Sequence, residues 1–319
     1  MKSLFYTLLL FLYQTQLIPL ETIDYLDTNE FVNGFVLTTS RPVDKPNILG
    51  VLTLCPNKQT NNKPTWQLAQ WGTQFLLTPG SFNQVNETTW TIKNQAKQIT
   101  IQEENQDWGI SLNCNGIVEY QGRLRKYGEP WPHLLIEKNF DEGIKILGNN
   151  IYFNIEFRIT NCSCDPTLKD KLDPTLHTAQ ITAYWTVRNA NSKSKDFNEY
   201  FWFGIPLFDA RCPIPPEYIN VDKGSTYTTN KLIAVIDGKR FYDHNTGDGD
   251  WKKLNILLNP LFEEALNKGK AQNFLKDSNI EDLVLSSFNL GWEITGPYNA
   301  EIQIKHLSHL CGANIKKIF

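Results

Sequence analysis

The sequence predicts an all-β fold, an antiparallel β-sandwich of the jelly-roll type with one accessory α-helix. Several segments alternate apolar and polar residues with a period of two, which is typical of strands with one buried face. Turn residues such as Asn115-Gly116 and Gly296-Pro297 separate these segments. One segment alone carries apolar residues at helical spacing. Many short strands of this kind pack as a sandwich or jelly roll.

The first residues match a secretory signal. Lys2 precedes a run of apolar or nearly apolar residues from Leu4 to Tyr13, LFYTLLLFLY. This run is shorter than the roughly 20 residues that a membrane-spanning helix needs, and it fits the apolar region of a signal peptide. No small-residue cleavage pattern follows it. We expect residues 1–16 to be the signal peptide of a secreted protein; an apolar N-terminal strand or a retained anchor is the alternative.

Three segments show the strand pattern most clearly. Residues 151–160, 178–189 and 300–305 each place apolar side chains on one face and polar ones on the other. Further strands are expected at 34–39, 49–54, 89–92, 98–102, 110–114, 117–125, 201–207, 231–236 and 283–294. Residues 254–268 have helical spacing, with a helix start at Asn259-Pro260 and a stop at Gly269. No linker divides the chain, so residues 17–319 are expected to form a single large sandwich domain.

Charge and cysteine content narrow the function classes. The chain has 31 basic and 34 acidic residues, a net charge of −3, and no block of five like charges. A nucleic-acid or anionic-membrane surface is therefore excluded as its main function. Six cysteines in an exported chain indicate disulfides of undetermined pairing, while Cys162-x-Cys164 alone is a weak zinc pattern. Asn86 and Asn161 begin glycosylation sequons, so a glycoprotein is expected.

The polar faces of the predicted strands carry directional hydrogen-bonding groups. Three strands contribute them: Glu156 and Arg158 on the first, Gln180, Tyr184 and Arg188 on the second, and Glu119, Gln121, Arg123 and Arg125 on the third. Such groups, with aromatic faces nearby, suit the hydroxyls and C–H patches of sugars. We expect these side chains to converge in one groove. The alternative is an ordinary salt-bridged sheet surface.

Other segments add aromatic and titratable candidates. Residues 127–137 place Glu129, Trp131 and His133 on a loop stiffened by Pro130 and Pro132. A structural corner with Trp131 in the core is equally compatible. Asp209 and Arg211 have the same parity after an apolar strand that contains Trp202, and could pair as a simple ion pair or line a cleft. His177 stands at a strand entry, where a structural role is the more common one.

A loop at residues 242–251 contains clustered oxygen donors. Asp243, Asn245, Asp248 and Asp250 lie among glycines and could hold Ca²⁺, although the spacing is not that of an EF-hand. A plain polar turn is the favoured interpretation, so no cofactor or metal is predicted and these four are weak Ca²⁺ candidates.

The segments IYFNIEFRIT, HTAQITAYWTV and LGWEITGPYNAEIQIKHLS give the chain a resemblance to the concanavalin A-like lectins and glucanases. The resemblance is architectural and covers most of the chain after about Leu49. It implies a secreted jelly roll that engages carbohydrate. The E-x-D-x-x-E pattern of one glucanase branch is absent, as are the R-x-E-L-R and Q-I-H patterns of one alginate-lyase branch, so the resemblance assigns no catalytic residue.

We therefore expect a secreted, lectin-like sandwich that binds an extracellular glycan or polysaccharide on a concave sheet face. The alternatives are a glycoside hydrolase or polysaccharide lyase that uses the same groove, and a structural or protein-interaction module. Hydrolysis needs two carboxylates about 5–10 Å apart, and Glu129, Glu137, Glu156, Asp209 and Glu293 are available. The catalytic candidates are Glu156, His177, Tyr184 and Asp209. The binding candidates are Arg123, Arg125, Trp131, Glu156, Arg158, Gln180, Tyr184, Arg188 and Trp202.

Overall fold

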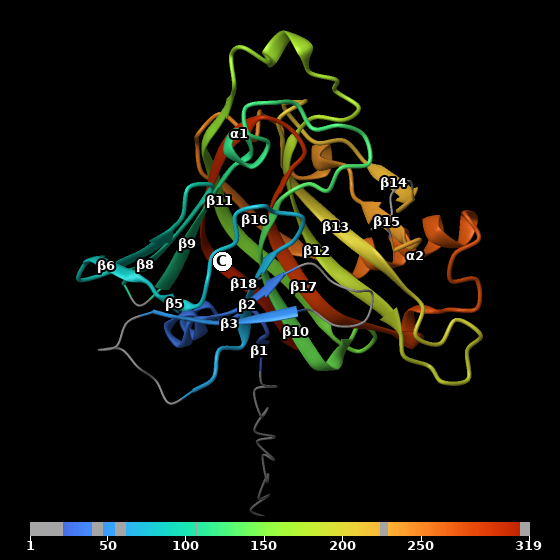
Figure 1. Ribbon diagram of the computed structural model, residues 1–319. Coiled ribbons are helices and arrows are strands. Elements are labelled where there is room, and N and C mark those ends of the chain that lie inside the picture. Colours follow the sequence, from blue (N-terminus) through green and yellow to red (C-terminus); the bar gives the residue numbers. More distant parts are fainter. Residues whose placement is uncertain (1–21, 40–46, 55–61, 106, 224–228, 313–319) are drawn as a thin grey trace, which may run out of the picture.

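A computed structural model describes residues 22–39, 47–54, 62–105, 107–223 and 229–312. The predicted signal peptide, residues 1–16, lies outside these ranges and stays a prediction. No helix within them combines the length and apolarity that crossing a bilayer requires. The described residues form two large sheets, here called sheet A and sheet B (Figure 1).

Sheet A has eight strands among the described residues, in the order β16-β11-β18-β9-β8-β7-β6, with β1 paired to β18. Every pairing in it is antiparallel. The strands are β1 (Ile23–Asp24), β6 (Asn83–Asn86), β7 (Thr89–Lys93), β8 (Lys97–Glu104), β9 (Asp107–Asn115), β11 (Asn150–Cys164), β16 (Lys252–Leu257) and β18 (Tyr298–Gly312). In Figure 1 the strands β6, β8 and β9 extend to the left of the molecule.

Sheet B has ten strands within the described ranges, in the order β14-β15-β13-β12-β17-β10-β4-β2-β3-β5. It is mostly antiparallel; the pairs β13–β15, β2–β4 and β3–β5 are parallel. The strands are β2 (Phe35–Thr39), β3 (Asn47–Thr53), β4 (Trp66–Gln70), β5 (Gly80–Ser81), β10 (His133–Lys145), β12 (Ala179–Asn189), β13 (Tyr200–Asp209), β14 (Tyr218–Val221), β15 (Leu232–Val235) and β17 (Leu283–Ile294).

The apolar faces of the two sheets pack against each other. Phe153 of β11 meets Trp185 of β12 edge to face, with ring centroids 4.9 Å apart, and both side chains are fully buried. Apolar and polar residues alternate in β11 and β12 because one face of each strand lies in a shared core, as the sequence predicts. The structure confirms the predicted antiparallel β-sandwich with one accessory helix.

That helix is α2 (Asn259–Ala271), which lies beside β14 and β15 (Figure 1). Its buried Phe262 contacts Phe203 of β13 at a centroid distance of 4.6 Å. Phe203 also contacts Trp185 in the core, so α2 covers the inner face of sheet B where sheet A does not extend. The shorter helices are α1 (Gly116–Glu119) and the 3-10 turns η1 (Thr28–Asn33), η3 (Lys169–Lys171), η4 (Gly238–Arg240) and η5 (Ile280–Asp282).

The helix boundaries correct two predictions. Residues 254–257 belong to β16, and α2 begins at Asn259 with Pro260 in its first turn. Gly269 does not stop the helix, which continues to Ala271. A Cβ atom at Gly269 would lie 2.8 Å from Leu232 Cδ2, so the glycine lets α2 approach β15 closely.

The predicted strand at residues 117–125 is also wrong. Asn115 caps a helical turn there, because its Oδ1 accepts a hydrogen bond from the backbone of Val118 at 3.2 Å. Glu119 is consequently buried instead of projecting from a sheet. The set Glu119, Gln121, Arg123 and Arg125 does not share a strand face.

The structure shows the state of the described cysteines and the surroundings of the two sequon asparagines. The five described cysteines, Cys114, Cys162, Cys164, Cys212 and Cys311, are free thiols, so the predicted disulfides are not formed among them. Cys55 lies outside the described residues. Burial raises the pKa of Cys162 to about 12, which makes its thiol a poor nucleophile. Asn86 is exposed on β6, whereas the side chain of Asn161 donates to Asn299 O at 2.9 Å.

The two outer faces carry the polar side chains of the strands, and this corrects the predicted single groove. Glu156 and Arg158 project from the outer face of sheet A, because their neighbours Ile155 and Phe157 point into the core. Gln180 and Tyr184 project from the outer face of sheet B for the same reason. These four residues lie on opposite sides of the sandwich and cannot line one groove.

Candidate functional site

The outer face of sheet B brings together polar side chains from three adjacent central strands. Glu293 of β17 lies between His133 of β10 on one side and Gln180 of β12 on the other. Thr182 and Tyr184 follow Gln180 on the same face of β12, and all three side chains are partly buried. His133, Gln180 and Glu293 come from three segments that are distant in the sequence, and the sheet topology brings them together.

Aromatic rings surround His133. The imidazole centroid lies 5.4 Å from the Trp71 ring and 5.6 Å from the Trp131 ring. We call these three residues the indole–imidazole cluster. The cluster joins the loop after β4 to the start of β10. Flat rings at such a position suit the C–H faces of a sugar.

Backbone geometry fixes the cluster. His133 N donates to Trp71 O at 2.8 Å. The next residue, Gly72, has φ +61°, and a Cβ atom there would lie 2.3 Å from Trp131 O. Only glycine accommodates both the left-handed backbone and this close approach without strain. Gly72 therefore lets the two tryptophan-bearing segments pack directly against each other.

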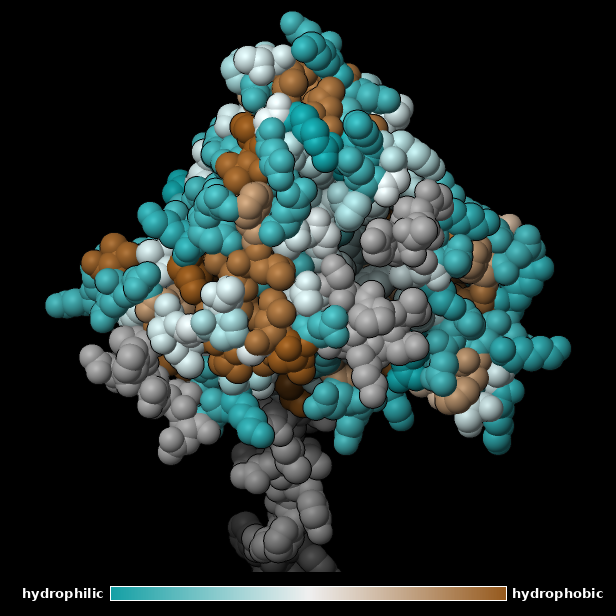
Figure 2. Space-filling model, in the orientation of Figure 1, coloured by the Kyte–Doolittle hydropathy of each residue, from teal (hydrophilic) through white to brown (hydrophobic). Residues whose placement is uncertain are grey.

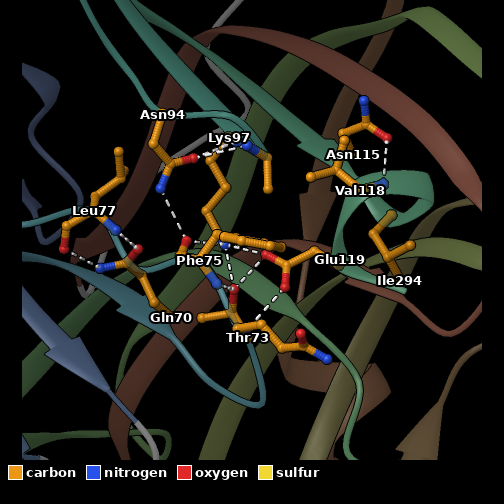
Figure 3. Close-up of polar contacts among 12 residues, drawn as sticks. Gln70, Thr73, Phe75, Leu77, Asn94, Lys97, Asn115, Val118, Glu119 and Ile294 are labelled. Carbon is orange, nitrogen blue, oxygen red and sulfur yellow. Dashed lines mark hydrogen bonds and ion pairs between the residues drawn. The ribbon is translucent and has the colours of Figure 1, made fainter. Parts of the chain in front are cut away.

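A buried ion pair anchors the loop that follows Trp71 (Figure 3). Lys97 of β8 and Glu119 of α1 are 2.5 Å apart, with 0% and 1% of their side chains exposed. Thr73 donates to Glu119 Oε1 and accepts from Lys97 Nζ, while Phe75 O accepts from Lys97 Nζ at 2.7 Å. In Figure 3 the Lys97, Glu119 and Thr73 side chains point toward one another.

The same network extends to the start of the loop. Gln70, the last residue of β4, exchanges two hydrogen bonds with the backbone of Leu77 at 2.7 and 3.2 Å. Gln74 N donates to Glu119 Oε2 at 2.8 Å. Every partner of this buried pair is thus supplied by the Thr73–Leu77 loop or by α1. The network holds the loop, and with it the position of Trp71.

A second chain of polar contacts orients Glu293. Gln180 Nε2 donates to Glu293 Oε2 at 2.9 Å, and Gln180 Oε1 accepts from Arg211 Nη2 at 3.4 Å. Arg211 in turn holds Asp209 at 2.5 Å, so the predicted pairing of Asp209 and Arg211 is confirmed. These contacts fix the amide of Gln180 and leave Glu293 Oε1 without a hydrogen bond to any described residue.

His133 presents a hydrogen-bond acceptor beside that carboxylate. Its Nδ1 lies 2.9 Å from Trp131 O. Since a carbonyl can only accept, Nδ1 carries the proton and Nε2 of the neutral ring is an acceptor. Burial lowers the pKa of His133, with a smaller opposing effect from Glu293. The ring is therefore neutral at neutral pH.

Tyr184 and Trp202 extend the aromatic surface away from the indole–imidazole cluster. Their ring centroids are 6.3 Å apart, and Tyr200 lies 5.9 Å from Trp202, both pairs edge to face. Burial raises the pKa of Tyr184, and Glu293 raises it further. The phenol therefore stays protonated and can donate a hydrogen bond. Arg188 lies further along β12, where its Nη1 donates to Asn198 Oδ1 at 2.8 Å.

Two pairs of carboxylates on this face differ in their spacing. Glu137 pairs in register with Asn289, four positions from Glu293 on β17, which separates the two along the strands by about 13 Å. Asp209 and Glu293 both flank Gln180, so their backbones lie about 10 Å apart. Asp209 is engaged by Arg211 and by Thr178 Oγ1 at 2.7 Å. Glu293, in contrast to Asp209, has an oxygen, Oε1, that makes no hydrogen bond with a described residue.

Several predicted residues have structural contacts. His177 is buried; its Nδ1 accepts from Asp173 N and its Nε2 donates to Arg125 O, both at 2.9 Å. Arg125 lies 5.2 Å from the Trp131 ring centroid and supports that indole from behind, since it is 8% exposed. Arg123 forms a solvent-exposed ion pair with Glu129 at 2.8 Å. Burial lowers the pKa of Arg125.

Several oxygens of the predicted calcium loop contact neighbouring residues. Both carboxylate oxygens of Asp248 accept from Lys252 Nζ at 2.7 Å, and Asn245 Oδ1 accepts from Gly247 N at 2.9 Å. Asp243 faces His244 at 3.6 Å, while Asp250 donates its backbone N–H to Asp248. Among the described residues, no group of three or more His, Cys, Asp or Glu side chains is placed to hold a metal ion.

Sequence reasoning missed part of this site. Trp71 was not among the predicted site residues, because no sequence pattern links it to Trp131, which lies sixty residues away. His133 and Trp131 were assigned to a loop; the loop ends at Pro132 and His133 begins β10. The register that places Glu293 between His133 and Gln180 was not visible in any one strand.

Comparisons with known proteins give matches at the level of solved structures. No family model and no curated protein matches the chain. A family 12 xyloglucanase from Bacillus licheniformis matches 71% of this chain and 94% of its own, with 13% identity and a TM-score of 0.38. Endoglucanase 3 from Trichoderma harzianum, of family GH12, matches 74% and 94%, with 8% identity and a TM-score of 0.36. The family 11 xylanase from Neocallimastix patriciarum matches 72% and 93%, with 10% identity and a TM-score of 0.28. Such low TM-scores assign no activity to this chain.

Proposed function

We propose that the outer face of sheet B binds a neutral glycan chain, and that the protein is a secreted carbohydrate-binding sandwich. The observation that carries the proposal is the pair of acceptors, His133 Nε2 and Glu293 Oε1, set beside the rings of Trp71 and Trp131. Sugar hydroxyls supply the donors that such acceptors need, and sugar C–H faces pack on indoles.

The charge of the site selects among glycans. Glu293 brings a carboxylate to the centre of the face, and burial lowers the pKa of His133, so the imidazole does not offset that carboxylate. Arg211 is the nearest cation in the polar chain, and Asp209 already neutralises it. A uronate would be repelled from Glu293. We therefore expect neutral oligosaccharides to bind more tightly than acidic ones.

The test is calorimetric titration of the full chain with cellohexaose, xylohexaose and laminarihexaose. Wild type, Glu293→Gln and His133→Phe are compared, with Phe197→Ala as a matched control at an exposed aromatic residue in the loop between β12 and β13. Each site variant is expected to bind about tenfold more weakly, because truncating a buried hydrogen-bonding contact costs about 1–3 kcal/mol. Unchanged affinity in both variants would contradict the proposal.

Glycoside hydrolysis on the same face is a second candidate. The observation that favours it is the position of Glu293 and Asp209 on either side of Gln180, a separation compatible with an inverting carboxylate pair. The contacts of Asp209 with Arg211 and Thr178 argue against it as a base. Release of reducing ends from the three oligosaccharides, abolished in both Glu293→Gln and Asp209→Asn, would establish hydrolysis in place of binding alone.

A further inference from the structure

The outer face of sheet A carries an aromatic feature that the proposed site does not use. Trp251 precedes β16 and is 39% exposed. Arg158 Cζ lies 4.7 Å and Lys305 Nζ lies 4.5 Å from its ring centroid. Both cations are within the range of a cation–π interaction. One exposed indole thus has two cationic neighbours.

The register of sheet A brings these three residues together. Lys252 pairs with Phe157, so Trp251 comes alongside Arg158 of β11. Lys305 of β18 pairs with Glu156, two positions from Arg158 on the same outward face. The indole therefore lies over the junction of β11 and β18, on rigid central strands of the sheet.

Arg158 has N–H donors that are not used within the described residues. Its Nε donates to Gln303 Oε1 at 2.9 Å, and its two Nη groups make no hydrogen bond with any described residue. A guanidinium presents a planar fork that matches a carboxylate or a sulfate. Because Gln303 fixes the Nε side, the fork is held in one orientation.

The two cations against Trp251 are incompletely paired. Glu156 is shared by Lys253 at 2.8 Å and Lys305 at 3.6 Å, so one carboxylate faces two ammonium groups. Arg158 has no carboxylate partner among the described residues, and Asp248 is held by Lys252. Arg158 and Lys305 can therefore each form a charge-assisted contact with an anion beside the indole.

Beside this cluster lies a hollow of about 510 Å³, within the usual range for a small-molecule site. Its near wall is Glu156, Lys253 and Asn255, and Asn255 Oδ1 is buried without a hydrogen bond. Its other wall includes Asp24 and Asp107. The lining is rich in acidic side chains, so an anionic group belongs at the Trp251 end and not in the hollow.

We propose that the outer face of sheet A is a second saccharide site, selective for a sugar unit that carries an anionic group. The sugar ring packs on Trp251, and its carboxylate or sulfate accepts from Arg158 Nη and Lys305 Nζ. The neighbouring uncharged unit extends toward the hollow. This inference does not depend on the neutral-glycan site, which is on the opposite face.

The test uses the full chain and titrates it with hexagalacturonate, with dextran sulfate, and with xylohexaose and dextran as uncharged counterparts. The variants are Trp251→Ala, Arg158→Gln and Arg158→Lys. Phe197→Ala is the control at an exposed aromatic residue. The two anionic probes distinguish a carboxylate from a sulfate as the recognised group.

At low salt, wild type should bind at least one anionic probe more tightly than its uncharged counterpart. Trp251→Ala and Arg158→Gln should each weaken that binding about tenfold, and high salt should weaken it in wild type. Arg158→Lys should recover part of the loss, since the charge returns without the fork. Phe197→Ala should bind as wild type does.

Three results would overturn the inference. The first is that wild type binds neither anionic probe. The second is that Trp251→Ala binds both probes as tightly as wild type does. The third is equal binding of charged and uncharged probes, which would mean an aromatic platform without charge recognition. A failure of Glu293→Gln to affect neutral glycans would count against the other face only, so the two proposals fail separately.

Discussion

The outer faces of sheets A and B differ in what surrounds their aromatic side chains. On sheet B, the indoles of Trp71 and Trp131 flank a neutral imidazole and a carboxylate. On sheet A, the indole of Trp251 lies against a guanidinium and an ammonium group. The same type of ring is thus placed in opposite electrostatic surroundings. We infer that one sandwich can hold two glycans of different charge.

The two faces also differ in how their aromatic residues are fixed. Trp251 rests on side chains that project from central strands of sheet A. Trp71 instead belongs to a loop held from below by a buried ion pair. The indole–imidazole cluster, which depends on a loop, should therefore be the easier of the two to disrupt.

In Figure 2 most of the visible surface is hydrophilic, with hydrophobic residues gathered on the left toward β6, where Val85 is exposed.

The largest effect is expected from Lys97→Met. It leaves Glu119 buried without its cation, which typically costs about 3–5 kcal/mol of unfolding free energy. Glycan binding on sheet B should fall with stability, while acidic-glycan binding on sheet A should persist in the folded fraction. Chemical denaturation with both titrations measures this. The double variant Lys97→Met/Glu119→Leu should recover much of the stability, and a double variant as unstable as the single one would show that the pair is not the cause.

A change in the core should affect both faces alike. His309 is fully buried among Tyr25, Phe140 and Trp185, and neither ring nitrogen has a hydrogen-bond partner. Burial lowers its pKa to about 3. Between about pH 6.5 and pH 3, the unfolded chain therefore binds a proton that the folded chain does not. The free energy of unfolding decreases as the pH is lowered through this window, by up to about 1.4 kcal/mol per pH unit.

His309→Phe should remove this dependence. Urea denaturation from pH 7 to pH 4 should give a flatter profile for the variant than for wild type. His244→Ala, at an exposed histidine, is the control and should leave the slope unchanged. Identical slopes in wild type and His309→Phe would mean that the ring is not buried as a neutral group.

Gly72→Ala should act on sheet B alone. The added Cβ would meet Trp131 O, and φ +61° would strain an alanine, together about 1–3 kcal/mol. Neutral-glycan affinity should fall, because Trp71 and Trp131 can no longer flank His133. Gly80→Ala is a matched control, since a Cβ there meets nothing within 4 Å. Equal behaviour of the two variants would refute the role assigned to Gly72.

The smallest effect is expected from Arg123→Ala. This residue was a binding candidate in the sequence, yet it forms an exposed ion pair with Glu129. Exposed pairs contribute about 0–1 kcal/mol. Neither stability nor affinity on either face should change by more than that. A loss of glycan binding larger than tenfold would extend the site to the Arg123 loop.

The sequence predicted the fold well where one strand face is buried and the other is polar. Residues 151–160 and 178–189 alternate because sheet A and sheet B each hide one face, and both strands were found. β10 was missed because Leu134, Leu135 and Ile136 are all buried, so no alternation marks it. α1 was taken for a strand because a capped turn of four residues carries no periodicity.

The candidate sites depended on information that a single strand does not carry. Parity shows which side chains share a face of one strand, but not which sheet the strand joins. Arg158 and Tyr184 were therefore expected in one groove and lie on opposite faces. Gln180, Tyr184, Trp202 and Trp131 do lie on or beside the outer face of sheet B, as components of one surface. Their partners Trp71 and Glu293 became visible only through strand register.

The most direct test of the neutral-glycan site is oxidative footprinting of tryptophans in the presence of cellohexaose, xylohexaose or laminarihexaose, followed by mass spectrometry. The account predicts protection of the peptide that contains Trp131 and no protection of the peptide that contains Trp251, with the Trp131 protection lost in Glu293→Gln. Protection confined to Trp251, or protection of Trp131 that survives in Glu293→Gln, would contradict it.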